Sequence, residues 1–359
     1  MTTDEYYMSR CLQLAKNGEM GAAPNPMVGA VIVCDGRIIG EGFHAHCGGP
    51  HAEVNAFNSV KDDSLLSEST LYVSLEPCAH FGKTPPCANL VVSKGVKRVV
   101  VGCIDPFAKV HGRGIKIIHD AGIDIEIGVL NRECKKLNRR FFVFHTYRRP
   151  YIILKWAQTA DGVMGMKSGD NHRLHISDLP ALRRVHHLRA QNKAILVGYN
   201  TALQDNPSLT VRLVDGPNPL RIVLDPKGQL SSDLRVFDGS VPTLVVGYRK
   251  NNSVLANGNV EFLRVGKSEN ILTQLMTELY ERGVQSVLVE GGANTLKDFL
   301  SLNLWDEAHV EHSPHKFVDL FPKGCLSAQP VYAPFINKKA YATESLGEAT
   351  IYHYMREEM

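Results

Sequence analysis

The sequence lacks any apolar run long enough to cross a membrane, and its start, MTTDEYYMSR, has acidic residues where a secretory signal has basic ones. Neither sign of charge is in excess, because 40 lysine and arginine residues stand against 37 acidic ones. This balance leaves no broad basic surface and disfavours nucleic acid as a partner. Eight cysteines in 359 residues are not a disulfide framework, and metal binding explains two of them better. We therefore expect a cytoplasmic protein with no membrane segment.

Also missing is GxGxxG, the signature of dinucleotide-binding Rossmann domains. The chain, with 359 residues of which 44% are hydrophobic, is long enough for two cores. β-rich runs alternate with helical patterns in both halves, which indicates α/β layers. A polar, arginine-containing segment ends the first half just before a β-rich run that begins at Tyr151. We therefore expect one domain over residues 1–146 and a second over 147–359.

Local patterns give the order of the elements. Asp35-Gly36 between two β-rich runs is the strongest short hairpin signal, and Gly95 is a typical helix stop. In the first half we expect helices over 3–18, 51–60 and 87–94, a helix entered at Gly112-Arg113-Gly114, and strands over 28–34, 37–43, 70–75, 97–102 and 123–127. In the second half we expect strands over 151–157, 194–198, 220–224, 243–247 and 286–289.

The strongest chemical signal lies between residues 51 and 87. His51-Ala52-Glu53 is followed by Pro77-Cys78 and then by Cys87. One imidazole and two thiolates form a three-ligand zinc site with a fourth position for water, which is typical of catalytic zinc. Glu53 is placed to take a proton from that water and to pass it to a leaving amine. This is the pattern of the zinc nucleobase deaminases, although Cys87 follows Cys78 by nine residues rather than three.

A structural zinc is the alternative interpretation of the same residues. It would need a fourth protein ligand, which His44, His46, Cys47 or His80 could supply. In that case the chain would be a binding protein that is stabilised by a structural zinc ion and has no catalytic activity.

The inserted run is specific in its own right. EPCAHFGKTPPC, with PNPMVGAVIV and HAEVNAF upstream, resembles the deaminase half of the bifunctional riboflavin-biosynthesis enzymes. These combine a diaminohydroxyphosphoribosylaminopyrimidine deaminase with an aminophosphoribosyluracil reductase, and the resemblance implies a cytidine-deaminase-like three-layer domain. It also implies that Asn25, His44, His80 and Lys83 contact the deaminase substrate, with Lys83 a suitable partner for a phosphate. Without the resemblance, Asn25 is explained equally well by turn chemistry and His44 as a surface histidine.

In the second half, a buried strand ends in Glu290-Gly291-Gly292 and leads into a helix. Backbone can approach a phosphate closely where Cβ is missing, so this is a candidate anion site, with a plain strand-to-helix turn as the alternative. The resemblance continues here, because KxxxxxDG, VHxLRA, VGxxT, DNPxLTVR and EGG occur in the order of the reductase half. It implies a dihydrofolate-reductase-like fold that uses NADPH.

The resemblance also implies roles for single residues, with Lys155 close to the reacting ribose. Arg189 and Arg212 together suit a phosphate, because two guanidinium groups can each bind its oxygens in pairs. As alternatives, Arg189 could be an ordinary residue on a helix surface and Asp205 part of a turn. The family's SxWIT is replaced here by RLHIS, which puts Arg173 and His175 in place of Ser and Trp, and Gln158 stands where some relatives have Ala. The implied cofactor residues are Gln158, His175, Thr201, Asp205, Gly292, Ala293, Asn294, Thr295, Leu296, Lys297 and Asp298. The implied substrate residues are Arg173, Arg189, Leu209, Arg212 and Glu290.

We therefore expect a two-step enzyme with one zinc ion per chain. It would deaminate 2,5-diamino-6-ribosylamino-4(3H)-pyrimidinone 5′-phosphate and then use NADPH to reduce the ribosyl group to a ribityl side chain. Small molecules would be its partners, together with further copies of itself in a homo-oligomer. The rival hypothesis is a deaminase of another nucleobase or of nucleic acid, with an inactive or differently used second domain.

Overall fold

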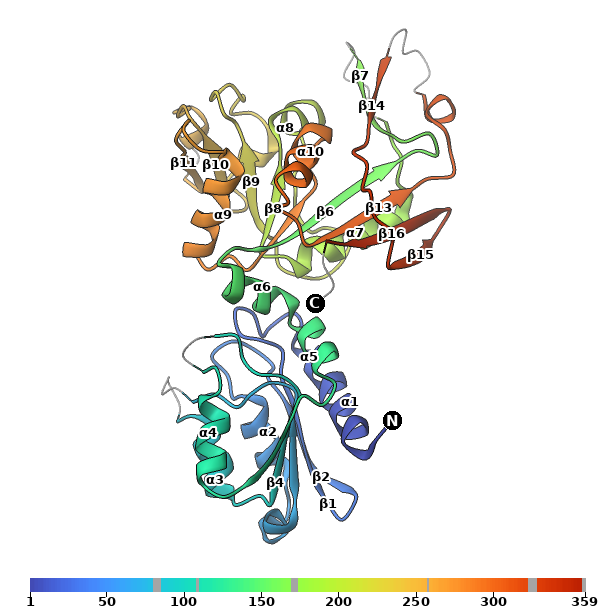
Figure 1. Cartoon of the computed structure of the whole chain (residues 1–359). Helices are drawn as coiled ribbons and strands as arrows, with labels where there is room; N and C mark the ends of the chain where they lie inside the picture. The colour runs from blue at the N-terminus through green and yellow to red at the C-terminus, as the bar shows by residue number, and fades with distance from the viewer. Residues whose placement is uncertain (80–84, 108–109, 169–173, 257, 322–327, 357–359) are drawn as a thin grey trace. The chain divides into compact units, whose positions relative to one another are not determined.

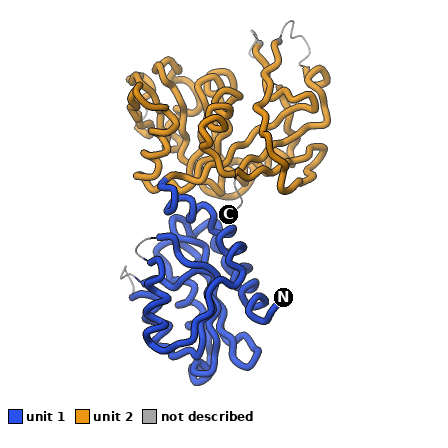
Figure 2. Tube along the Cα trace, viewed as in Figure 1, with its two compact units in different colours: residues 1–148, 359 blue, residues 149–358 orange. Residues whose placement is uncertain are grey.

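The computed structural model of the chain describes residues 1–79, 85–107, 110–168, 174–256, 258–321 and 328–356 (Figure 1). It divides into two compact units, Met1–Arg148 and Arg149–Glu358, and each contains its own sheet (Figure 2). Among the described residues, no helix has both the length and the apolarity that crossing a bilayer requires.

The first unit is built on a five-stranded sheet in the order β2-β1-β3-β4-β5. The predicted hairpin is confirmed: β1 and β2 pair antiparallel, and Asp35 and Gly36 between them both have positive φ angles. β3, β4 and β5 pair in parallel. The strands are β1 (Gly29–Cys34), β2 (Arg37–Phe43), β3 (Thr70–Val73), β4 (Arg98–Val101) and β5 (Asp124–Ile127).

Helices cover both faces of this sheet, which gives three layers. α1 packs on one face through Met8 and Cys11, against Val31 and Val33 of β1. The opposite face packs against α2, α3 and α4. The helices are α1 (Thr3–Ala15), α2 (Ala52–Ser59), α3 (Cys87–Lys94), α4 (Arg113–Asp120), α5 (Asn131–Leu137) and α6 (Arg139–Tyr147).

α5 and α6 occupy the polar, arginine-containing segment at the end of this unit, and the sequence patterns predicted neither helix. α5 buries only Cys134 among its seven residues, so it carries almost no apolar periodicity. α6 buries Phe141, Val143 and Phe144 although it begins with two arginines. Because of these arginines the sequence of α6 looks polar, although packing of its apolar side chains against the rest of the unit stabilises the helix.

The second unit contains a nine-stranded sheet in the order β11-β10-β9-β8-β12-β6-β13-β16-β15. Strands from β11 to β13 pair in parallel, and β16 and β15 continue the sheet antiparallel. β7 (Val163–Ser168) and β14 (Ala328–Tyr332) form a separate two-stranded ribbon. The strands of the large sheet are β6 (Tyr151–Gln158), β8 (Ala194–Val197), β9 (Leu220–Leu224), β10 (Thr243–Gly247), β11 (Val260–Arg264), β12 (Ser286–Val289), β13 (Glu307–His312), β15 (Ala342–Leu346) and β16 (Ala349–Met355).

The two faces of this sheet differ in chemistry near β6 and β13. One face is apolar: Ile152, Leu154 and Trp156 of β6 share a core with side chains of α9 and α10. On the other face lie charged side chains of β6 and β13, among them the ion pair of Lys155 with Glu311. α7 lies on this side, where Arg184 contacts His309 of β13 and Arg189 pairs with Glu290, which follows β12. We call this second side the polar face. The helices of this unit are α7 (Leu179–Gln191), α8 (Tyr199–Asp205), α9 (Ile271–Glu281) and α10 (Ala293–Ser301).

β13 was not predicted, although it lies inside the sheet. Its sequence, EAHVEH, reads as polar, yet Glu307, His309 and Glu311 are all less than a tenth exposed. Glu307 accepts hydrogen bonds from Tyr151 and Tyr341 and contacts His309 Nε2 at 2.9 Å. A charged residue can occupy a buried strand when its neighbours satisfy it in this way.

Candidate active sites

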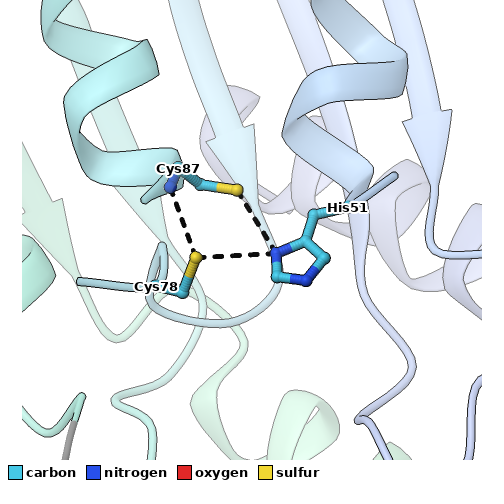
Figure 3. Close-up of side chains that lie close together, drawn as sticks. All are labelled: His51, Cys78 and Cys87. Carbon is cyan, nitrogen blue, oxygen red and sulfur yellow. Dashed lines mark hydrogen bonds between the residues drawn. The ribbon is translucent and has the colours of Figure 1, made fainter. Parts of the chain in front are cut away.

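The structure brings His51, Cys78 and Cys87 together in the first unit (Figure 3). His51 immediately precedes α2, and Cys87 is the first residue of α3. The His51 Nδ1 atom lies 3.5 Å from Cys78 Sγ and 3.3 Å from Cys87 Sγ, and the Cys87 amide donates to Cys78 Sγ at 3.3 Å. Potential ligand atoms of the three side chains all lie within 4.8 Å of one another. This is the donor set of a zinc site.

Electrostatics at this cluster favour a thiolate. The hydrogen bond from the Cys87 thiol, together with one from His51, outweighs burial and lowers the pKa of Cys78 to about 4. The contact with Cys78 and burial raise the pKa of Cys87. The hydrogen bond with Cys78 also raises the pKa of His51. The negative charge lies on the Cys78 thiolate, and a thiolate is the form of cysteine that binds a metal cation.

Glu53 lies in the first turn of α2, and its side chain is 3% exposed. Burial, helped by the charge on Cys78, raises the pKa of Glu53 to about 7. The carboxyl group also accepts a hydrogen bond from the Cys87 thiol, so it lies against the cluster. A carboxyl group that titrates near neutral pH is suited to proton transfer.

Asn25 and His44 form a hydrogen-bonded chain beside the cluster. His44 is buried, and its Nδ1 lies 3.0 Å from the Pro50 carbonyl oxygen, which makes Nδ1 the donor. Its Nε2 then accepts from Asn25 Nδ2 at 3.1 Å. The His44 ring also meets the His51 ring edge-on at 5.2 Å. These hydrogen bonds fix the Asn25 side-chain amide in one orientation, as recognition of a heterocycle edge requires.

The structure offers no fourth ligand among the described residues of the first unit, where the group of potential metal ligands has three members. His44 is engaged with Asn25 and Pro50, and Cys47 is exposed. The predicted substrate residues His80 and Lys83 lie outside the described residues. The described residues therefore favour a three-ligand site over a closed structural zinc.

Two residues that sequence reasoning missed hold this site in place. Asn138, between α5 and α6, donates to the Met27 carbonyl and accepts from the Met27 amide, both at 2.8 Å, and so fixes the loop that carries Asn25. Glu76 is 3% exposed and accepts from four backbone amides, those of Asp105, Gly112, Gly114 and Ile115. A glutamate directly before Pro77-Cys78 was the available signal for the second of them.

Replacing Glu76 with Gln should destabilise the first unit, because an amide cannot accept at both of its terminal atoms. Two of the four backbone donors would face an NH₂ group, so the free energy of unfolding should fall by about 3 kcal/mol. Urea denaturation measures this change. The exposed Glu68, paired with Lys97, is the matched control, and Glu68→Gln should change stability by less than about 0.5 kcal/mol. Equal losses in both variants would contradict the role given to Glu76.

In the second unit, the polar face carries a buried ion pair. Arg189 of α7 donates to both carboxylate oxygens of Glu290, from Nε at 2.9 Å and from Nη2 at 2.8 Å. Its Nη1 donates to the Thr210 carbonyl at 3.1 Å. Burial raises the pKa of Glu290, but the charge and hydrogen bonds of Arg189, together with the charge of Lys155, outweigh burial and lower it. These groups therefore form one electrostatic unit.

Arg212 adds a second guanidinium to this region. Its amide donates to His186 Nδ1 at 2.9 Å, and burial together with the charge of Arg189 lowers the pKa of Arg212. Burial and the same two arginines also lower the pKa of His186 to about 4. Cations that destabilise one another in this way are stabilised by a bound anion such as a phosphate.

The Gly291-Gly292 turn provides close backbone approach at the ends of β8 and β12. A Cβ on Gly291 would lie 2.8 Å from the Gly198 amide nitrogen, and the Gly292 amide donates to Thr201 Oγ1 at 2.7 Å. α10 begins directly after Gly292. The turn therefore brings together Thr201 and the start of α10, which the sequence predicted as cofactor-binding.

The other predicted reductase residues lie at different depths. His175 and Asp205 are exposed, whereas the side chains of Leu209 and Leu296 are at most 2% exposed and belong to the apolar core, so only their backbones can meet a ligand. Arg173 lies outside the described residues. Along α10, Ala293 and Thr295 are buried, and Asn294, Lys297 and Asp298 are exposed. Gln158, at the end of β6, accepts from Trp156 Nε1 at 2.8 Å.

Known proteins resemble both units. Residues 1–103 match the family described as "Cytidine and deoxycytidylate deaminase zinc-binding region", and residues 150–317 match "RibD C-terminal domain". This confirms the predicted fold class of a deaminase-like domain followed by a reductase domain.

Relatives match the chain over most of its length. The riboflavin biosynthesis protein RibD of Aquifex aeolicus is 37% identical over 358 residues, which cover 98% of both chains. RibD of Escherichia coli is 37% identical over 326 residues, 87% of this chain and 88% of that one. Two solved structures also cover 98% of both chains. The diaminohydroxyphosphoribosylaminopyrimidine deaminase/5-amino-6-(5-phosphoribosylamino)uracil reductase of Thermotoga maritima is 37% identical to this chain, with a TM-score of 0.82. Acinetobacter baumannii RibD is 33% identical, with a TM-score of 0.85. The chain therefore belongs to the RibD family of bifunctional deaminases and reductases of riboflavin biosynthesis.

Proposed function

We propose that residues 1–146 form a zinc-dependent deaminase and residues 147–359 an NADPH-dependent reductase. The first would act on 2,5-diamino-6-ribosylamino-4(3H)-pyrimidinone 5′-phosphate and release ammonia. The second would reduce the ribosyl group of the resulting pyrimidinedione to a ribityl chain. The observation that carries the proposal is the convergence of His51, Cys78 and Cys87 beside the buried Glu53.

One zinc ion per chain fits the donor set of the first unit. His51 Nδ1 and the two sulfurs are close enough to share one cation, and the low pKa of Cys78 supplies a thiolate. Zinc bound there supplies the Lewis acidity that activates water at neutral pH. Glu53 takes the proton of the attacking water and delivers it to the departing amino group. Asn25, oriented by His44, holds the pyrimidine edge, and His80 and Lys83 complete the substrate contacts.

The reductase assignment rests on the polar face and the glycine turn. NADPH supplies the hydride, and the residues near the turn, with Gln158, His175, Asp205 and α10 through Asp298, would hold it. Arg212 and Arg189 would bind the phosphate of the substrate, and Glu290 anchors Arg189. By the family resemblance, Arg173 and the backbone of Leu209 would also contact the substrate. Lys155 on β6 would lie at the reacting ribose and can donate a proton there.

The direct test is to incubate the purified chain with the diaminopyrimidinone ribosyl phosphate, with and without NADPH. Ammonia and the absorbance of the reduced nicotinamide are followed separately. Ammonia release without NADPH, followed by NADPH oxidation when it is added, supports the proposal. The rival, a deaminase of nucleic acid, predicts deamination of tRNA and no NADPH oxidation.

Two further measurements address the remaining predictions. A parallel titration with NADH tests the preference for NADPH. Light scattering tests the homo-oligomer, which stays a prediction.

Metal removal should separate the two activities. Chelation is expected to abolish ammonia release and to leave reduction of the deaminated pyrimidine intact, because His51, Cys78 and Cys87, the ligands proposed for the catalytic zinc, all belong to the first unit. Elemental analysis, run beside both assays, checks that the metal has left and that added zinc restores deamination. Equal loss of both activities, with the second unit still folded, would contradict the two-site assignment.

A further inference from the structure

Glu311 is a buried carboxylate on the polar face that sequence reasoning did not single out. Its side chain is 2% exposed, and its Oε2 lies 3.5 Å from Lys155 Nζ and accepts from Ser177 Oγ at 2.9 Å. Its Oε1 is also buried and accepts no hydrogen bond from the part of the chain that the structure describes. A buried carboxylate oxygen without a donor loses its hydration uncompensated, so it points to a missing hydrogen-bond donor.

The strand register explains why Glu311 faces Lys155. β13 pairs in parallel with β6, with Glu311 opposite Ala157, and Lys155 projects from the same face two residues earlier. On the other side of β6, the pairing of Leu154 with Val289 brings Glu290 alongside Lys155. The lysine thus stands between carboxylates of two neighbouring strands.

The two carboxylates differ in what they still need. Both oxygens of Glu290 are occupied by Arg189. Glu311 has an ammonium and a hydroxyl on one oxygen and no donor on the other. A carboxylate accepts hydrogen bonds and repels phosphate, so a substrate group bound at its Oε1 must be a hydrogen-bond donor and not the phosphate. Sugar hydroxyls are such donors, and a bond to an ionised carboxylate is the strong kind.

We propose that Glu311 binds the sugar of the reductase substrate: Oε2 holds the Lys155 ammonium, and Oε1 accepts a hydrogen bond from a ribose hydroxyl. This inference rests on the proposed function, because it takes Lys155 to lie at the reacting ribose. It divides substrate recognition between two ends of one site. Arg189 and Arg212 face the phosphate, and Glu311 reads the hydroxyl-bearing chain.

The test is steady-state reduction of the deaminated pyrimidine ribosyl phosphate by Glu311→Ala. Loss of a hydrogen bond to a charged group should raise the KM for this substrate by about 10- to 100-fold and leave the KM for NADPH unchanged. Glu311→Gln keeps the volume and replaces a charge-assisted bond by a neutral one, so it should show a smaller rise and keeps the test available if the alanine variant does not fold.

Glu307→Ala is the matched control. It removes another buried carboxylate from the same face of β13, but one whose partners are the side chains Tyr151, Tyr341 and His309. It should lower the melting temperature without changing the KM for the pyrimidine. If both variants change every kinetic constant alike, Glu311 is structural and the proposal is overturned.

Other outcomes separate this inference from the proposed function. An unchanged KM for the pyrimidine in Glu311→Ala overturns the role of Glu311 alone. A rise in the KM for NADPH instead places the hydroxyl on the cofactor and also overturns it. If the wild-type chain does not oxidise NADPH with this substrate, the proposed function fails and this inference fails with it.

Discussion

Glu53→Gln is expected to release ammonia about 10²- to 10⁴-fold more slowly than the wild-type chain while it keeps its metal. The amide has nearly the shape of the carboxyl group, so the three potential ligands keep their positions. It cannot take a proton from water at neutral pH, and proton transfer is the role proposed for Glu53. Ammonia release and zinc content, measured on the same sample, check the prediction.

Reduction of the deaminated pyrimidine is the internal control for this variant. It should proceed at the wild-type rate, because Glu53 belongs to the first unit and Lys155 to the second. A variant that still deaminates at the wild-type rate would refute the proton-transfer role. A variant that has lost its zinc would show instead that Glu53 supports the metal cluster.

The raised pKa of Glu53 also gives the sign of a stability change in the metal-free chain. Burial raises the pKa to about 7 in the folded state, so the folded protein binds this proton more tightly than the unfolded protein does. The stabilisation from this proton is present at low pH and is lost as the pH rises through about 7. Glu53→Gln cannot lose a proton, so metal-free Glu53→Gln should be more stable than metal-free wild type above neutral pH. Melting temperatures across the pH range test this.

What the sequence could predict differs between the two units for physical reasons. Few residue types bind zinc, and His51-Ala52-Glu53, Pro77-Cys78 and Cys87 follow one another in the order of a zinc deaminase pattern, so the three ligands could be singled out from chemistry and order together. The strand-to-helix glycines were visible because Gly291 must approach the Gly198 backbone closely. Such constraints act on single residue types and therefore leave a trace in the sequence.

The missed features depend on partners that are distant in sequence. Glu76 acts through amides about 30 to 40 residues away, and Asn138 acts on Met27, which is 111 residues away. β13 has the alternation of a strand, but its polar residues face α7 and the neighbouring strands rather than water. From composition alone, Glu311 looks like a surface glutamate. Only the register of the sheet places it beside Lys155.

Glu290→Gln is expected to abolish reduction and to spare deamination. The ion pair between Glu290 and Arg189 is about nine-tenths buried on both sides and uses both carboxylate oxygens. Removing one charge leaves the guanidinium buried without its anion, which should cost the second unit about 3–5 kcal/mol of stability. It should also free Arg189 from the position in which we propose that it meets the phosphate. NADPH oxidation, ammonia release and urea denaturation are the three measurements.

A double variant separates the loss of stability from the loss of function. Replacing Arg189 with Met and Glu290 with Leu removes both charges and keeps apolar volume, which in buried pairs often restores stability. The free energy of unfolding should therefore recover most of the loss seen in Glu290→Gln. Reduction should stay abolished, because Arg212 alone is left to meet the phosphate once Arg189 and its anchor Glu290 are gone. If the double variant regains NADPH oxidation together with its stability, the pair serves only the fold, and the phosphate of the substrate is held elsewhere.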